Sequence, residues 1–198
     1  ASGISYKYII ALIIVAVPLA LGLLWYVQQP DQKLLEDYQI ERILSTMYPE
    51  EYELSSALQT QNSVQAIGSG QLYGKGLYQG KLNQYDYLPE PQTDFIFSII
   101  GEEFGFVGCS AVLILLLLLI LRVLYIAKDS NDLMGRLLVT GFVAVITFHT
   151  FINVGVTTAI VPNTGLPLPF VSYGLSALVS NMLMLGMIIN LSMQRKTS

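Results

Sequence analysis

Residues 137–194, LLVTGFVAVITFHTFINVGVTTAIVPNTGLPLPFVSYGLSALVSNMLMLGMIINLSMQ, run for fifty-eight positions without one Asp, Glu, Lys or Arg. A helix that crosses a membrane needs about 20 apolar residues, so this stretch can supply two crossings and a connection. Pro162, Pro167 and Pro169 interrupt its middle and exclude one continuous helix. The stretch therefore predicts an integral membrane protein, and functional residues are sought where polar side chains interrupt the apolar sequence.

The composition of the whole 198-residue chain agrees with a membrane protein. Hydrophobic residues make up 53% of it and charged residues only 12%, whereas soluble domains carry about 25% charged residues. The net charge of −4 and the lack of a basic tract argue against a nucleic-acid partner. The single cysteine, Cys109, excludes a disulfide within the chain, and we interpret it as a small packing residue.

The pattern of apolar runs predicts an all-α integral membrane protein with about four transmembrane helices. We expect them at residues 8–27, 109–127, 137–156 and 176–193. A polar loop region, residues 28–108, separates the first two. A proline-rich second loop, residues 157–175, separates the last two and could re-enter the membrane, because irregular backbone at membrane depth must be buried or line a cavity. Residues 1–198 are treated as a single polytopic membrane domain.

The distribution of Lys and Arg predicts the orientation in the membrane. Six of these residues and two acids fall on the side of the two termini, whereas four basic residues and twelve acids fall on the other side. The positive-inside rule then places both termini in the cytoplasm and both loops outside the cell. The chain opens on Ala1 without a cleavage site of the signal-peptide kind, and we expect a piece of a longer polytopic protein.

The long loop region is predicted to contain short helices. Apolar residues between positions 34 and 47 recur at helical spacing among charged ones, which indicates an amphipathic helix at the membrane surface. A glycine-rich turn follows and reaches Gly80. A second short helix is expected over residues 94–104, leading into the second crossing.

The glycine-rich segment at residues 68–76, GSGQLYGKG, is similar to a phosphate-binding loop but fails its pattern. Ser69 stands where the first glycine belongs, and Gly76 replaces the Ser or Thr. We interpret it as a tight loop with positive φ angles. The alternative is that its backbone N–H groups, with Lys75 and Lys81, hold a lipid diphosphate.

An acidic residue follows the prolines of the segment LPEPQTDFIF, residues 88–97. Thr93 can cap a helix and Asp94 then lies in its first turn, where a carboxylate favours the positive helix end. The functional alternative is a carboxylate at the mouth of a membrane site that accepts a proton from a substrate hydroxyl. Glu102 lies roughly on the same helix face, and the pair Glu102–Glu103 is interpreted as a solvated helix end.

Polar residues also interrupt the last two crossings. His149 and Asn153 are one turn apart in the third, and we favour a hydrogen bond between helices over a functional site. The uncharged loop over residues 161–174 is expected on the same side as Asp94, so that both border one cavity. Ser172 and Tyr173 are its best hydrogen-bonding candidates.

These segments, in this order, resemble the SEDS family (shape, elongation, division and sporulation) of bacterial membrane proteins. The matching text is QNSVQAIGSG at residues 61–70, GKG at 74–76, LPEPQTDFIF at 88–97, GEEFGFVG at 101–108, NVG at 153–155 and GLPLPFVSYG at 165–174. The chain is similar to the C-terminal part of a ten-helix protein. Leu175 departs from the family, which usually has a second glycine there.

The resemblance implies a peptidoglycan glycosyltransferase that polymerises lipid II at the outer face of the bacterial cytoplasmic membrane. It implies that Asp94 is the catalytic general base, with a class B penicillin-binding protein as partner and a divalent cation, Mg or Mn, as a plausible cofactor. The lipid bilayer and lipid II, an undecaprenyl-diphosphate-linked disaccharide pentapeptide, are the other expected partners. The expected substrate-binding residues are Gln61, Ser63, Lys75, Lys81, Thr93, Glu102, Ser172 and Tyr173.

Two other functions stay open. A flippase for a lipid-linked precursor needs polar residues through the membrane interior, and the sequence offers little beyond His149, Asn153 and a few Ser and Thr. A non-catalytic scaffold for division or elongation enzymes is the third interpretation. Lipid translocation without glycan product, or function without the acid, distinguishes these from the polymerase.

Overall fold

The computed structural model describes residues 6–27, 39–40, 44, 56–80, 92–129 and 133–194. Within them all regular secondary structure is helical. The long elements are α1 (Tyr6–Val27), α3 (Ser56–Gly70), α5 (Ile96–Asp129), α6 (Leu133–Thr157) and α7 (Leu175–Gln194). The surface helix predicted over residues 34–47 falls almost entirely outside the described residues.

Three helices of the described part are long and apolar enough to cross a membrane, namely Ile96–Lys128, Leu133–Thr157 and Leu175–Met193. Each contains one of the last three predicted crossings. The chain is therefore a multi-pass membrane protein, and its described part is all-helical. The first predicted crossing corresponds to α1, a helix of 22 residues with Pro18 inside it. That α1 is a fourth crossing stays a prediction.

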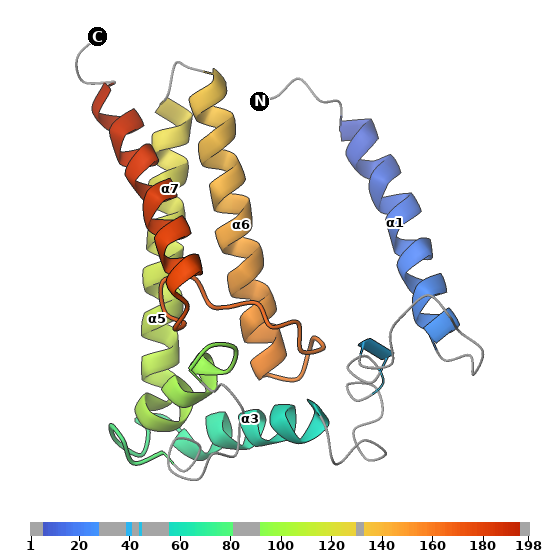
Figure 1. Ribbon diagram of the computed structural model, residues 1–198, viewed down its shortest axis with the longest axis vertical. Coiled ribbons are helices and arrows are strands. Elements are labelled where there is room, and N and C mark those ends of the chain that lie inside the picture. Colours follow the sequence, from blue (N-terminus) through green and yellow to red (C-terminus); the bar gives the residue numbers. More distant parts are fainter. Residues whose placement is uncertain are drawn as a thin grey trace.

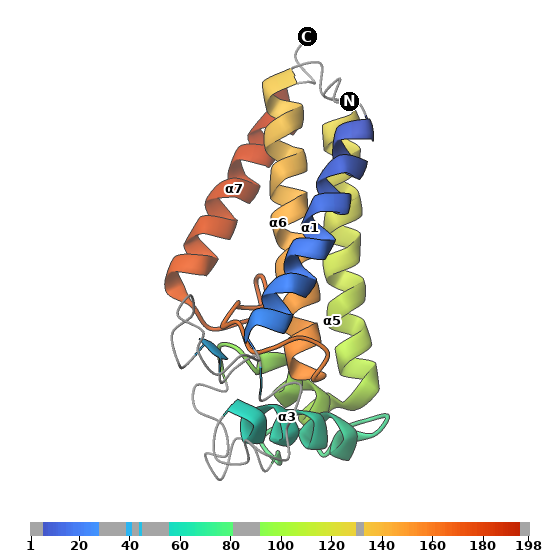
Figure 2. The same cartoon turned by 90° about the vertical axis from the view of Figure 1, so that its right-hand side faces the viewer.

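The three long helices α5, α6 and α7 stand side by side, and α3 lies across the end at which α5 begins (Figures 1 and 2). The connection between α6 and α7 lies at this same end. In Figure 1, α1 stands apart from the other helices. The glycine-rich turn, the segment before α5 and the proline-rich loop thus gather at one end of the bundle.

Two of the three buried clusters of the described residues hold the long helices and the proline-rich loop together. One joins α5, α6 and α7 through Val123, Val139, Phe142, Ile146 and Ile188, among others. The other joins both parts of α5 to the proline-rich loop through Phe97, Cys109, Leu116 and Leu168. Leu168 is 1% exposed, and burying a leucine side chain contributes roughly 1.5–3 kcal/mol. The loop therefore packs back against α5, and Cys109 is the packing residue that the sequence predicts.

Helix α5 contains a break that matches the predicted short helix before the second crossing. Gly105 has φ 65° and ψ −162° and separates residues 96–104 from the apolar remainder. The turn after α3 fills this break, because Phe106 N donates to Gln71 O at 2.8 Å and Val107 N donates to Leu72 O at 3.1 Å. The break thus fixes the glycine-rich turn against α5.

Helix α3 was not predicted from the sequence. Its buried face consists of Ser63, Ala66 and Gly70, which recur at helical spacing but carry little apolar surface. The Ser63 hydroxyl donates to Thr157 O at 2.7 Å, and since it has one proton, the Ser98 hydroxyl donates to Ser63 Oγ at 2.5 Å. Hydroxyl bonds to α5 and α6 replace the apolar stripe by which such a helix is usually recognised.

Candidate functional site

Asp94 lies in the turn that immediately precedes α5 and is partly exposed. Its carboxylate faces the proline-rich loop, because a Cβ placed on Gly165 would lie 3.5 Å from Asp94 Oδ2. The next residue, Phe95, is 1% exposed and packs with Ala66 of α3 and Val156 of α6. The buried Phe95 side chain therefore fixes the backbone next to the partly exposed Asp94.

Hydrogen bonds join the segment that carries Asp94 to the proline-rich loop. Ser172 Oγ donates to Thr93 O at 2.6 Å and accepts from Leu168 N at 2.7 Å. Tyr173 N donates to Gln92 O at 2.9 Å. The prediction that Asp94 and this loop lie on the same side is confirmed, whereas the cavity that both were expected to border stays a prediction.

Asn153 adds a further connection. Its side-chain Nδ2 donates to the backbone oxygens of Asp94 and Leu166, each at 2.9 Å. The sequence suggested a bond between two helices, whereas the observed bonds run from α6 to the two loop segments. Asn153 is 1% exposed, so it contacts the Asp94 segment on the side that faces the protein interior and not on the side that faces solvent.

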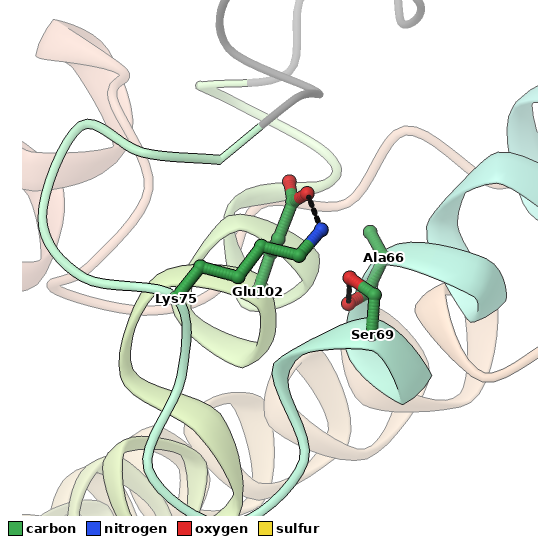
Figure 3. A network of polar contacts seen from close by, with 4 residues as sticks. All are labelled: Ala66, Ser69, Lys75 and Glu102. Carbon is green, nitrogen blue, oxygen red and sulfur yellow. Dashed lines mark hydrogen bonds and ion pairs between the residues drawn. The ribbon is translucent and has the colours of Figure 1, made fainter.

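The interpretation of Glu102–Glu103 as a solvated helix end is wrong. Glu102 is 2% exposed and Glu103 is 5% exposed, because the glycine-rich turn covers them. The Lys75 ammonium pairs with Glu102 Oε1 at 2.7 Å. Figure 3 shows the lysine reaching across to the carboxylate, and beside it the Ser69 hydroxyl, which donates to Ala66 O within α3. Glu102 therefore serves this ion pair beneath the turn.

The glycine-rich segment is the tight loop that the sequence predicts. Gly74 and Gly76 have φ angles of 79° and 105°. The backbone N–H groups of Gly74, Lys75 and Gly76 donate to carbonyl oxygens of Gly70, Glu102 and Glu103. These three donors are engaged inside the protein, which leaves the Lys75 ammonium as the observed cation of the turn; that it holds a diphosphate stays a prediction.

The remaining predicted binding residues are not gathered in one place. Tyr173 is 75% exposed beside the Asp94 segment, whereas Ser63 is fully buried in its bonds to Ser98 and Thr157. Gln61 is exposed on α3. Lys81 lies outside the described residues. Thr93, Ser172 and Tyr173 are the predicted binding residues that lie with Asp94, and Ser172 contacts Thr93 through the Thr93 backbone oxygen.

A groove of about 730 Å³ lies between α6 and α7. Its walls are mostly apolar, and His149, Ser176, Ser180 and Asn181 add polar groups. Pro167 of the proline-rich loop closes one end. The groove therefore begins next to Leu166. The Asn153 side chain donates hydrogen bonds to the backbone oxygen of Leu166 and to that of Asp94.

The described residues do not form a metal cage of their own. Among them, no three His, Cys, Asp or Glu side chains come together. A magnesium ion is usually held by one or two carboxylates together with substrate phosphates and water. That a divalent cation binds here stays a prediction, and the chemistry proposed below uses only the chain's own residues.

We expect Lys75→Met to destabilise the fold at the turn. The substitution leaves the Glu102 carboxylate buried without its cation, which costs several kcal/mol in a fully buried pair. Because the lysine side chain is 30% exposed, the expected loss is smaller, about 1–2 kcal/mol. Thermal unfolding in detergent measures it. The matched control is Lys75→Met with Glu102→Gln, which removes the stranded charge and should recover part of the loss; an equally unstable double variant would contradict the ion-pair explanation.

Comparison with known proteins decides the family. The sequence model of the family described as "Cell cycle protein", which covers FtsW, RodA and SpoVE, matches residues 1–197. The chain belongs to the SEDS family. A SEDS relative named peptidoglycan glycosyltransferase MrdB, from Escherichia coli K12, is 37% identical over 98% of this chain and 51% of its own length. Stage V sporulation protein E from Bacillus subtilis 168 is 43% identical over 78% of this chain and 42% of its own length.

A solved SEDS-like structure agrees with the sequence comparisons. It comes from work on the coordination of polymerization and crosslinking by a peptidoglycan synthase complex, and it matches with a TM-score of 0.75 and 28% identity. The match covers 99% of this chain and 52% of that one. The chain thus spans about half the length of the SEDS relatives that it matches.

Proposed function

We propose that this chain contributes the Asp94-bearing half of a peptidoglycan glycosyltransferase that polymerises lipid II in bacterial cell-wall synthesis. The observation that carries the proposal is the placement of Asp94, a partly exposed carboxylate that faces an uncharged loop at one end of a membrane helix bundle. The names of the relatives support the reaction class, since MrdB is itself called a peptidoglycan glycosyltransferase.

In the proposed reaction Asp94 is the general base. Its carboxylate takes the proton from the 4-hydroxyl of the acceptor sugar. The oxygen attacks the anomeric carbon of the growing chain, the new glycosidic bond forms, and the bond to undecaprenyl diphosphate breaks as that group leaves. The bonds from Ser172 and Tyr173 to the backbone before Asp94 hold the carboxylate against the loop, which lowers the cost of orienting it for each transfer.

The proposal includes the surroundings of the enzyme. Both termini face the cytoplasm and the Asp94 end of the bundle faces outward in the bacterial cytoplasmic membrane, in accord with the distribution of Lys and Arg. A class B penicillin-binding protein is the proposed partner, and the solved relative from a synthase complex for polymerization and crosslinking supports this choice. The active molecule is proposed to include N-terminal helices in addition to this chain.

The test of the function uses purified protein with and without the N-terminal helices, each with its penicillin-binding partner. Both are incubated with lipid II, and the products are separated on a gel. We expect long glycan strands from the form that has the additional helices. If that form makes no glycan in the presence of its partner, the enzyme assignment fails.

The groove between α6 and α7 favours one second candidate, a flippase for the lipid-linked precursor. Its polar groups, His149 and Asn181 among them, could accompany a headgroup part of the way through the membrane. Movement of fluorescent lipid II across vesicles, without any glycan product, would favour the flippase over the polymerase. Glycan formation without movement across the vesicle would exclude it.

A further inference from the structure

Asn153 is an amide buried in the last part of α6, where it is 1% exposed. Both of its Nδ2 hydrogens are used, one on Asp94 O and one on Leu166 O. The opposite assignment of amide oxygen and nitrogen would place an acceptor against two carbonyl oxygens, so the contacts themselves fix the orientation of the amide. Asn153 is thus a double donor toward main-chain groups only.

The two carbonyl groups that Asn153 holds belong to the two segments that form the candidate site. One is the backbone carbonyl of the proposed base. The other belongs to the residue after Gly165, where a Cβ would lie 3.5 Å from Asp94 Oδ2. A single side chain therefore bridges the backbone of Asp94 and the loop that its carboxylate faces, in addition to the bonds that Ser172 and Tyr173 make to the preceding residues.

The burial of Asn153 has a cost that points to this role. Its Oδ1 atom is buried and has no hydrogen-bond partner among the residues that the structure describes. A buried polar atom without a partner destabilises a fold, and the two hydrogen bonds that the same amide donates offset this cost. Helix packing alone does not require an amide here, whereas holding two carbonyl groups at once does.

We infer that Asn153 is a positioning residue for Asp94, an inference that rests on the proposed function of Asp94 as the base. Removal of the two bonds weakens the link between the backbone of Asp94 and the loop, so that this backbone can shift although the bonds from Ser172 and Tyr173 remain. A misplacement of about 1 Å in a reacting group can lower a rate by about a hundredfold. Substrate binding by other residues is unaffected, so the loss falls on kcat rather than on KM.

The test compares Asn153→Ala and Asn153→Asp in the protein that includes its N-terminal helices, with lipid II as substrate. Aspartate keeps the shape of the side chain but, when ionised, donates no hydrogen bond. We expect both variants to lose about 10- to 100-fold in kcat with KM within about twofold. The matched control is Asn190→Ala, an exposed amide of α7, which should retain the wild-type rate. An Asn153→Asp variant with wild-type kcat would overturn the inference.

A double-mutant cycle separates positioning from a general structural role. Asp94→Glu already moves the carboxylate, so adding Asn153→Ala to it should cost less than about threefold, whereas independent effects would multiply. A fully multiplicative loss would indicate that Asn153 acts through folding alone.

A second measurement does not depend on polymerase activity. Cysteines replace Gln92 and Tyr173, two exposed positions joined by a backbone hydrogen bond, while the native Cys109 is buried. We expect Asn153→Ala to slow disulfide formation between them at least about fivefold, because the two segments separate more often. If the wild type makes no glycan but this effect appears, the proposed function fails and the positioning geometry stands. An unchanged rate overturns the positioning geometry.

Discussion

Replacing Asp94 by Asn is expected to abolish glycan polymerisation while the protein still folds and binds lipid II. A general base contributes about 10²- to 10⁴-fold to a rate, and the amide cannot take the proton from the acceptor hydroxyl. The fold should persist, because the bonds of Asn153 end on the Asp94 backbone oxygen and not on its carboxylate. Gel analysis of glycan products and equilibrium binding of lipid II measure the two effects separately.

Two further variants sharpen this result. Asp94→Glu keeps a carboxylate but moves it by one methylene, and should retain a reduced, measurable rate. Asn190→Ala should polymerise like the wild type. Full activity of Asp94→Asn would remove Asp94 from the mechanism, and growth of cells that carry only Asp94→Ala would support the scaffold interpretation in place of the enzyme.

Gly105→Ala is expected to have the largest effect on stability. The φ of 65° and ψ of −162° at this residue fall in a region that is essentially restricted to glycine. A Cβ there would also lie 2.4 Å from Gly74 N and 2.6 Å from the Leu72 carbonyl carbon. Strain and clash together should cost about 3 kcal/mol or more, which lowers the unfolding midpoint by roughly 6–12 °C. Thermal unfolding in detergent measures the midpoint.

Gly68→Ala is the matched control, because a Cβ on this α3 glycine would meet nothing within 4 Å. Within a helix alanine is more favourable than glycine by roughly 0.5–1 kcal/mol, so this variant should be at least as stable as the wild type. If Gly105→Ala were as stable as Gly68→Ala, the break in α5 would not be the rigid feature described above.

The membrane helices were predictable from the sequence because hydropathy alone marks them. The apolar runs place α5, α6 and α7 within a few residues, apart from the short helical part that precedes Gly105 in α5. Helix α3 was missed because its contact face is made of Ser63, Ala66 and Gly70. Such a face packs by close approach and hydroxyl bonds, neither of which raises the hydrophobic signal of a helix.

The candidate site was predicted in its location but not in its construction. The shared side of Asp94 and the proline-rich loop followed from the order of the crossings. The burial of Glu102 and Glu103 could not be predicted in this way. Two adjacent acidic residues are expected to be exposed to solvent unless the turn that covers them is known. The two hydrogen bonds from Asn153 could not be predicted from the sequence either. Both acceptors are main-chain carbonyl groups, which every residue type carries.

The hydrogen bonds that hold the site together restrict substitution at some of its residues more than at others. The contacts from Asn153, Ser172 and Tyr173 all end on main-chain oxygens, at Gln92, Thr93, Asp94 and Leu166. A substitution at the accepting positions leaves the carbonyl acceptor in place, whereas loss of the Asn153 or Ser172 side chain removes a donor; the Tyr173 donor is a backbone N–H. The side chains that surround the acid can therefore diversify, for example to suit a different acceptor sugar or stem peptide, without dismantling the frame that presents it.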